Sequence, residues 1–396
     1  MILWIGLIVS LALLFLIAQR NLYLAMFAAA VSLGLITLPL GDFFGQLFET
    51  FTDPSVVSLA LVVAAIAMIG GTLERSGGMR DLVRNMRIGK KPFLIFSPAL
   101  LGMLPMPGGA LLSAPMVEES GSELSGDNKA ALNVWFRHIL FFIYPLATAL
   151  IASAKIAGLE VYGVIPYLMP FFVLTLFTGY YFTVRHAGRK MDYSDAFSPR
   201  GLLVPLSIIL VAPMVDLLLK VFMKPEVTEY ATLAGVLISF AGAVLFAGYG
   251  GRGLLEVTRK MQPWNFSLII LGMFAFLNVF ESSGAPEELG SLDIPLPILL
   301  VFLSFLLGFA TGRIQAPASI IIPIYLARFG GSSMPPVAFA ITYFSIFLGY
   351  VVTPVHPCVS VSIEYFGTSL QAYMRRLIWP TLISLLVAGL LAVFLL

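Results

Sequence analysis

The sequence predicts an all-α polytopic membrane protein built from two inverted repeats of five transmembrane helices. Each repeat is expected to contain a re-entrant hairpin and a proline-broken helix. Of the 396 residues, 59% are hydrophobic and 11% are charged, and the mean hydropathy is +0.97. Average soluble domains carry about 25% charged residues, so this composition indicates a membrane protein. The distribution of basic residues and the similar order of elements in the two halves of the chain support the same conclusion.

Ten stretches have the length and composition of membrane-spanning helices, which need about 20 apolar residues. They are 2–18, 22–40, 55–73, 130–153, 160–184, 200–222, 229–248, 264–281, 337–361 and 377–396. The first stretch follows no basic region and precedes no clear cleavage site. We therefore expect it to be a retained helix and not a signal peptide.

Two further apolar stretches, 92–117 and 296–327, are interrupted at their centres by glycine and proline. A straight helix over 296–327 would be about 48 Å long, whereas the hydrocarbon core is about 30 Å thick. Each stretch is better explained as two half-helices that enter and leave the membrane on the same side.

Lysine and arginine residues test this topology. With ten crossings, no crossing by either hairpin and the N-terminus outside, seventeen basic residues lie inside and four lie outside. This distribution obeys the positive-inside rule. If either hairpin crossed the membrane, every later loop would change sides and the excess of basic residues inside would shrink. The segment 74–91 is therefore expected on the cytoplasmic side and 282–294 on the outer side, with both chain termini outside.

The two halves of the chain also resemble each other. TLERSGGMRDL (72–82) aligns with VFESSGAPEEL (279–289), and Gly102 then falls near Gly308. We expect residues 1–190 to form the first inverted repeat and 191–396 the second. Inverted repeats with broken helices are typical of secondary transporters, whose sites lie near the middle of the membrane.

Four broken elements are predicted in symmetric pairs. The hairpin tips are PMPGGALLS (105–113) and ATGRIQAPAS (310–319), and two later spans are broken around Pro145 and around Pro354 and Pro357. Backbone freed inside a membrane must be buried by protein or line an aqueous cavity. Half-helix N-termini suit anions, and the opposite helix ends suit a cation such as Na⁺. A binding site is therefore expected where these breaks meet.

Arg313 is the strongest candidate for that site. A charge at the bilayer centre costs roughly 2.5–3.5 kcal/mol, so an intramembrane arginine is a site hypothesis by default. Its guanidinium can hold a carboxylate with two parallel hydrogen bonds. The structural alternative is that Arg313 caps carbonyls of the broken helix or pairs with a buried acid.

The other candidates are small or polar residues at the breaks. For substrate binding they are Gly108, Gly109, Ser113, Gln315, Ser319, Thr353 and His356, and for ion coupling Arg137, His138, Pro107 and Thr311. Glycines let backbone approach a ligand, and histidine can bind substrate or a proton. The alternatives are hairpin packing for the glycines, helix–helix hydrogen bonds for the hydroxyls, and snorkelling to the interface for Arg137 and His138. Asp216 and Glu74 lie near helix ends and are expected at the interface.

The motifs PMPGGALLSAP, NVWFRH and TPVHPC…EYFG resemble a prokaryotic integral-membrane family of unknown function. The order of elements resembles the ion transporter superfamily, which includes citrate and dicarboxylate symporters and gluconate-type permeases. This resemblance covers the whole chain and implies a homodimer in the prokaryotic cell (inner) membrane, an elevator-type motion of the hairpin-bearing part and coupling to Na⁺ or H⁺. Neither tip contains the Ser-Asn-Thr triplet by which dicarboxylate symporters bind carboxylate and Na⁺, so the substrate and the coupling ion stay open.

The sequence thus predicts an ion-coupled secondary transporter of a small organic anion, such as a carboxylate. An exporter or carrier of a phosphate-bearing or lipid-linked anion is the alternative within transport, and a channel suits the broken repeats less well. An intramembrane enzyme is a third possibility, but the chain has no HExxH or GxSxG motif and its three histidines are far apart in sequence. The chain has no glycine-rich nucleotide-binding loop, so we do not expect ATP-driven transport by this chain alone. We expect no metal site, no cofactor beyond the coupling ion and no nucleic-acid partner.

Overall fold

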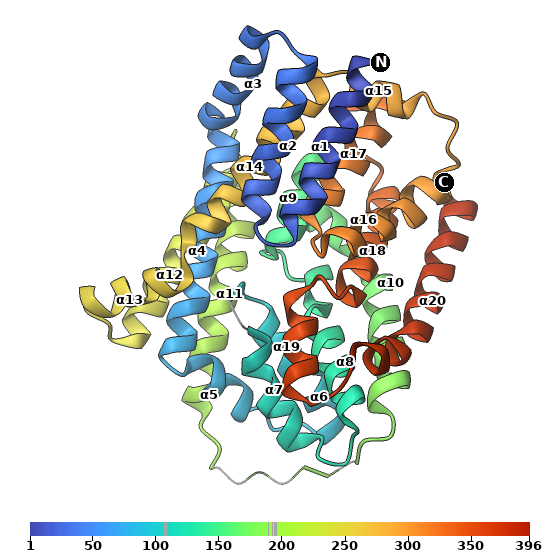
Figure 1. Ribbon diagram of the computed structural model, residues 1–396. Helices are drawn as coiled ribbons and strands as arrows, with labels where there is room; N and C mark the ends of the chain where they lie inside the picture. Colours follow the sequence, from blue (N-terminus) through green and yellow to red (C-terminus); the bar gives the residue numbers. More distant parts are fainter. Residues whose placement is uncertain (107–108, 189, 192, 194–195) are drawn as a thin grey trace.

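The structure is a computed structural model that describes residues 1–106, 109–188, 190–191, 193 and 196–396. This part of the chain is helical throughout (Figure 1). The first half contains α1 (Ile2–Ala18), α2 (Leu22–Thr37), α3 (Leu40–Thr52), α4 (Pro54–Arg75), α5 (Gly78–Arg84), α6 (Lys90–Gly102), α7 (Gly109–Ser120), α8 (Gly126–Arg137), a 3₁₀ segment η1 (Ile139–Phe142), α9 (Thr148–Ile156) and α10 (Val161–Gly179), which a π-helical segment η2 (Tyr180–Val184) extends. The second half contains α11 (Pro199–Phe222), α12 (Glu229–Ala247), α13 (Gly251–Met261), α14 (Pro263–Ser282), α15 (Ala285–Gly290), a π-helical segment η3 (Ile298–Leu303) that leads into α16 (Ser304–Thr311), α17 (Gln315–Phe329), α18 (Pro336–Val352), α19 (Pro357–Tyr365) and α20 (Leu370–Leu395).

The described helices make this a multi-pass membrane protein. Seven helical stretches within the described ranges are long and apolar enough to cross a membrane: 54–75, 161–184, 199–222, 229–247, 263–282, 336–365 and 370–395. Helices α1 and α2 are equally apolar but shorter, with 17 and 16 residues. These nine coincide with nine of the predicted spans. The tenth, 130–153, is divided among α8, η1 and α9.

The four predicted helix breaks are confirmed. The stretch 92–117 is divided between α6 and α7, and the stretch 296–327 between α16 and α17. Pro145 lies between η1 and α9, and Pro354 lies between α18 and α19. Pro357 is the first residue of α19, where the missing N–H of a proline has no helical partner to lose.

The elements α1 to α10 recur in the same order as α11 to α20. The clearest local match is the turn after α4 and after α14, which the two aligned motifs form. Gly77 and Gly284 both adopt left-handed backbone, with φ of 81° and 72°, and their N–H groups donate to Glu74 and Glu281 at 3.1 and 3.2 Å. Glycine adopts this conformation without the steric cost that a Cβ brings.

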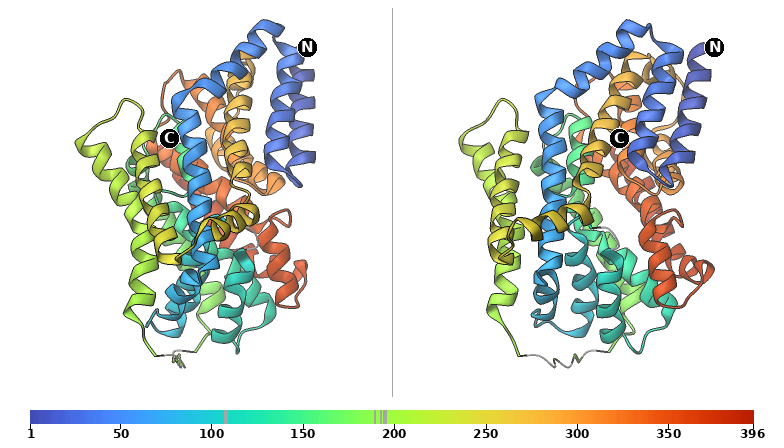
Figure 2. Two further views of the ribbon diagram at one scale, coloured as in Figure 1. Left: turned by 90° about the vertical axis from the view of Figure 1, so that its left-hand side faces the viewer. Right: turned by 60° about the vertical axis from the view of Figure 1, so that its left-hand side comes forward.

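Six long helices form one row in the order α1, α2, α14, α4, α12 and α11. Each packs against its neighbours in this order, and Figure 2 shows α1 and α2 at one end and α11 and α12 at the other. At the centre of the row α4 packs against α14. Helix α12 packs on α4 as α2, the helix in the same position in the first half, packs on α14. We call these six helices the scaffold row.

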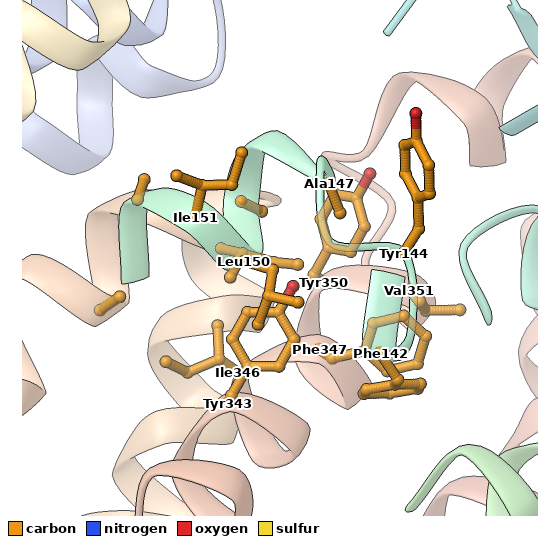
Figure 3. Close-up of a cluster of buried hydrophobic side chains, with 14 of the residues drawn as sticks. Phe142, Tyr144, Ala147, Leu150, Ile151, Tyr343, Ile346, Phe347, Tyr350 and Val351 are labelled. Carbon is orange, nitrogen blue, oxygen red and sulfur yellow. The ribbon is translucent and has the colours of Figure 1, made fainter. Parts of the chain in front are cut away.

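The elements α6 to α10 and α16 to α20 form what we call the hairpin bundle. Contacts are again reciprocal, because α7 packs on α19 as α17 packs on α9, and α8 packs on α20 as α18 packs on α10. Helix α18 is buried from Ala338 to Val352. Figure 3 shows one core cluster, in which aromatic and aliphatic side chains of α18 meet the segment around the helix break at Pro145. There Phe142 and Phe347 have ring centroids 4.4 Å apart.

Asp216, which we expect at the membrane interface near the end of α11, is covered by neighbouring helices. It is 2% exposed and accepts hydrogen bonds from Tyr162 (2.8 Å) and Thr232 (2.9 Å), so it ties α10 and α12 to its own helix α11. The segment between the second and third predicted spans is largely the helix α3, whose polar residues interrupt the apolar run too often for a spanning segment.

Equivalent glycines let helices of the hairpin bundle approach closely. A Cβ added at Gly102 of α6 would clash with the backbone carbonyl of Arg137 at the end of α8. A Cβ at Gly308 of α16 would clash with the carbonyl of Ile346 in α18. Because backbone atoms cannot rotate away, each glycine sets the distance between its hairpin and the following helix.

We expect Gly102→Ala and Gly308→Ala each to destabilise the protein by about 1–3 kcal/mol, because the added methyl group forces two packed helices apart. The measurement is the thermal melting temperature in detergent. Gly389→Ala in α20 is the matched control, because a Cβ there meets no atom within 4 Å. Equal melting temperatures for all three variants would contradict this account of the packing.

Candidate functional site

A cavity of about 400 Å³ lies between the scaffold row and the hairpin bundle. Leu22 of α2 and Phe266 and Ile269 of α14 form its wall on the scaffold side. The remaining wall comes from the hairpin bundle and collects all four helix breaks: Gly102, Leu104, Pro105, Met106, Gly109, Ala110, Arg137, His138, Phe141, Thr148, Ala149, Arg313, Ile314, Gln315, Tyr350, His356, Pro357, Cys358 and Val361. A cavity of this size can hold a small molecule.

Four helix N-termini end at this cavity. Residues in the first turns of α7, α9, α17 and α19 line it, represented by Gly109, Thr148, Gln315 and Cys358. The first N–H groups of a helix have no helical partner, and the helix dipole makes this end electropositive. The breaks therefore direct four partial positive charges towards one space.

Arg137 brings a full positive charge to the same space. Its side chain is 4% exposed, so snorkelling to the interface is not the explanation for its position. The guanidinium donates to the carbonyl of Leu101 (3.0 Å) and approaches the hydroxyl of Ser113 (3.4 Å), both in the first hairpin. Gly109 makes room for it, because a Cβ there would clash with the guanidinium. Arg137 is thus held against the first hairpin tip by neutral groups.

Arg313 is the second charge and comes from the other hairpin. It is half-buried and follows Gly312, whose left-handed backbone (φ 60°) ends α16. Its backbone N–H is bonded to Thr311, whereas its guanidinium makes no hydrogen bond or ion pair with any described residue. The alternative in which Arg313 caps the broken helix or pairs with a buried acid therefore has no contact to support it.

No aspartate or glutamate occurs among the described residues that line the cavity. Neither arginine has a carboxylate within ion-pair distance in the described ranges. Buried charges in proteins are normally paired, so two unpaired cations around one cavity require another source of negative charge.

Aromatic and sulfur-containing side chains form another part of the wall. The rings of His138 and His356 have centroids 4.9 Å apart, and Tyr350 packs against both at 5.1 and 4.3 Å. Cys358 Sγ lies 3.9 Å from His138 Nε2. The two histidines are 218 positions apart in sequence, and their separation there concealed this proximity.

The structure brings six of the predicted site residues to the cavity: Gly109, Arg137, His138, Arg313, Gln315 and His356. The hydroxyls of Ser113, Thr311, Ser319 and Thr353 instead bond to neighbouring backbone groups and lie off the described wall, because short polar side chains readily bond to backbone groups within one helical turn. The predictions for Pro107 and Gly108 fall outside the described residues.

Sequence reasoning missed Tyr350 and Cys358. Tyr350 lies in a mostly apolar run without a helix break. In such a run the sequence gives no way to distinguish a tyrosine that faces a cavity from one that packs in the core. Cys358 had a usable signal, since it is the only cysteine and follows the His356-Pro357 pair at the break. Its separation from His138 in sequence hid the cluster.

The structure of the Alcanivorax borkumensis YdaH transporter, described as having an unusual topology, is similar to this fold. The TM-score is 0.58 with 16% sequence identity, and the match covers 97% of this chain and 98% of that chain. The fold of this chain is thus similar to that of a membrane transporter. A search of curated protein sequences gives no match. The family model described as a protein of unknown function (DUF401) matches residues 3–395, and the chain therefore belongs to the DUF401 family.

Proposed function

We propose that the protein is a secondary active transporter of a small organic anion. The observation that carries this proposal is the positively charged cavity: two arginines and four helix N-termini face a space whose described wall contains no acid. A carboxylate can accept a pair of hydrogen bonds from a guanidinium, and each such charge-assisted bond is stronger than a neutral one.

The rest of the wall indicates an anion with an apolar body. Leu104, Met106, Phe141, Phe266 and Ile269 present hydrocarbon to the cavity. Inorganic anions have no apolar surface to bury, whereas an organic acid gains about 25 cal/mol for each Å² that it removes from water. The alternative substrate, a phosphate-bearing organic anion, is supported by the helix N-termini, which suit phosphate groups.

The transport cycle that we propose has the hairpin bundle moving against the scaffold row. The cavity lies between these two groups of helices, and both hairpin tips belong to the moving group. The element order supports two inverted repeats, 1–190 and 191–396, in a homodimer within the prokaryotic cell membrane. Coupling to Na⁺ or H⁺ would drive accumulation. The proposal is transport, with no chemical reaction at this site.

Inversion of the repeats predicts opposite sides for equivalent loops. Ser122 follows the second arm of the first hairpin, Ser332 follows the second arm of the second hairpin, and both are exposed. Cysteines introduced at these two positions, each in a Cys358→Ser background, should react with a membrane-impermeant maleimide from the cytoplasmic and the outer side, respectively. Labelling of both from the same side would contradict the inverted topology.

A ligand screen tests the proposed function itself. Purified protein is melted in the presence of mono- and dicarboxylates, phosphate esters and cationic or neutral metabolites, with and without Na⁺ and at several pH values. We expect an anion to raise the melting temperature, because a ligand at 100 times its Kd stabilises the folded state by about 2.7 kcal/mol. The hit is then tested for uptake into proteoliposomes. Stabilisation by cations or neutral compounds alone would refute anion transport, and a preference for phosphate esters would select the alternative substrate.

A further inference from the structure

Three potential metal-ligand side chains meet on the cavity wall. His138 is the residue that ends α8, His356 precedes α19, and Cys358 is in the first turn of α19. One ring nitrogen of each histidine and the cysteine sulfur all lie within 4.8 Å of one another. Both histidines are 3% exposed, and Cys358 is half-buried. Because the three side chains come from two helix breaks, they hold this arrangement only in the folded protein.

His356 has no described hydrogen-bond partner at either ring nitrogen, although both atoms are buried. Buried polar atoms are almost always bonded to protein, water or an ion, so two unpartnered nitrogens on one imidazole require an explanation. A metal ion beside the ring would satisfy one of them.

His138 is oriented as a ligand should be. Its Nδ1 lies 2.9 Å from the carbonyl oxygen of Val134, which fixes the ring and places the proton on Nδ1. The lone pair is then on Nε2, the atom that lies near Cys358 Sγ. Metal-binding histidines almost always donate their second ring N–H to such an acceptor.

We propose that His138, His356 and Cys358 form a three-ligand site for a thiophilic divalent cation of the Zn²⁺ class. Tetrahedral Zn²⁺ with Zn–N of about 2.0–2.1 Å and Zn–S of about 2.3 Å places N and S about 3.6 Å apart. The observed separation of 3.9 Å between His138 Nε2 and Cys358 Sγ needs only a small adjustment. Two imidazoles and a thiolate favour Zn²⁺ and related ions over Mg²⁺ and Ca²⁺, which prefer oxygen ligands.

Two cationic side chains lie close to this site. Arg137 and Arg313 lie close enough to Cys358 to interact with it electrostatically. Positive neighbours favour the thiolate that binds metal, but they also repel a divalent cation, so the affinity must come from the three ligands themselves. When the ion binds, the thiol of Cys358 loses its proton to solvent. The electron pair left on the sulfur forms the bond to the metal. Three protein ligands leave a fourth position, and the ligands line the cavity in which the anion is proposed to bind.

Cobalt(II) is the probe for this site, because its absorption reports both geometry and ligands. The full-length protein is purified without a polyhistidine tag and titrated with Co²⁺. We expect one ion per chain, intense visible bands of tetrahedral cobalt and a thiolate-to-metal charge-transfer band in the near ultraviolet, all abolished by added Zn²⁺. Cys358→Ser should remove the charge-transfer band. Loss of a partner outside the ligand shell already costs about 10–100-fold in metal affinity, so His138→Ala and His356→Ala should each weaken binding by at least about 100-fold.

His186→Ala is the matched control, because His186 is the remaining histidine and is exposed outside the cavity. It should bind Co²⁺ like the unmodified protein. Cobalt bands that survive in Cys358→Ser and in both cluster-histidine variants would overturn the proposal.

A second measurement needs no substitution. Cys358 is the only cysteine, so the rate of its modification by a small maleimide is measured directly on the unmodified chain. Saturating Zn²⁺ should slow this rate at least about tenfold, whereas Mg²⁺ should not, because Zn²⁺ binds the thiolate and Mg²⁺ prefers oxygen. An unchanged rate with Zn²⁺ would overturn the site even if the variants failed to fold. Neither measurement involves transport, so the metal site and the proposed function can fail independently.

Discussion

Arg313→Gln should lower the affinity for the transported anion about ten- to hundred-fold while the protein remains folded. A charge-assisted hydrogen bond contributes about 1.5–3 kcal/mol, and about 1.4 kcal/mol corresponds to a tenfold change in affinity. The guanidinium has no hydrogen bond or ion pair with the described residues, so its removal takes no contact from the empty protein. The measurement is the Kd of the anion identified by thermal shift, together with the melting temperature of the unliganded variant.

Two further variants make this test specific. Arg313→Lys keeps the charge but loses the planar pair of donors, so its affinity should lie between those of the unmodified protein and Arg313→Gln. Arg328→Gln is the control in the same hairpin, because Arg328 lies at the far end of α17 and pairs with Asp293 at 3.6 Å. A well-folded Arg313→Gln protein with unchanged affinity would show that this side chain does not hold the anion.

The helices and their breaks could be predicted because their causes are local. An apolar stretch that is too long for one crossing and has glycine and proline at its centre must bend or break, and this argument located both hairpins. The similar turns at Gly77 and Gly284 were also visible in the sequence, because left-handed backbone selects glycine.

The composition of the cavity wall could be predicted only in part, because it depends on which breaks meet. Arg313 was found because it stands inside a hairpin tip. Arg137 was underestimated because its span gave no sign that α8 ends against Gly102 and Gly109 of the preceding hairpin. Sequence distance likewise hid the proximity of His138 and His356. The hydroxyls that looked functional bond to local backbone, either to freed N–H groups at the breaks, as Thr311 and Thr353 do, or to carbonyls of their own helix.

Arg137→Met should abolish binding of the anion and leave the unliganded protein at least as stable as before. Arg137 is 4% exposed, and no carboxylate among the described residues pairs with it. An unpaired buried charge costs several kcal/mol, and replacing buried charged groups with apolar side chains of similar size is often neutral or stabilising by about 1–4 kcal/mol. The hydrogen bonds to Leu101 (3.0 Å) and Ser113 (3.4 Å) that the substitution removes have a charged donor and are worth about 1.5–3 kcal/mol each, the longer one least. We expect the relief of the unpaired buried charge to offset their loss.

The two melting temperatures, with and without the anion, decide between a binding role and a structural role for Arg137. If the charge is kept for the substrate, the unliganded Arg137→Met protein melts at the same or a higher temperature, and saturating anion no longer raises it. If Arg137 mainly holds the first hairpin to α8, the unliganded variant melts at a lower temperature and the folded fraction still binds the anion. Arg20→Met, at an exposed position between α1 and α2, controls for the effect of the substitution itself and should change neither value. A protein that buries a cation at the cost of its own stability does so for a ligand of opposite charge, and this pair of measurements shows whether Arg137 is such a cation.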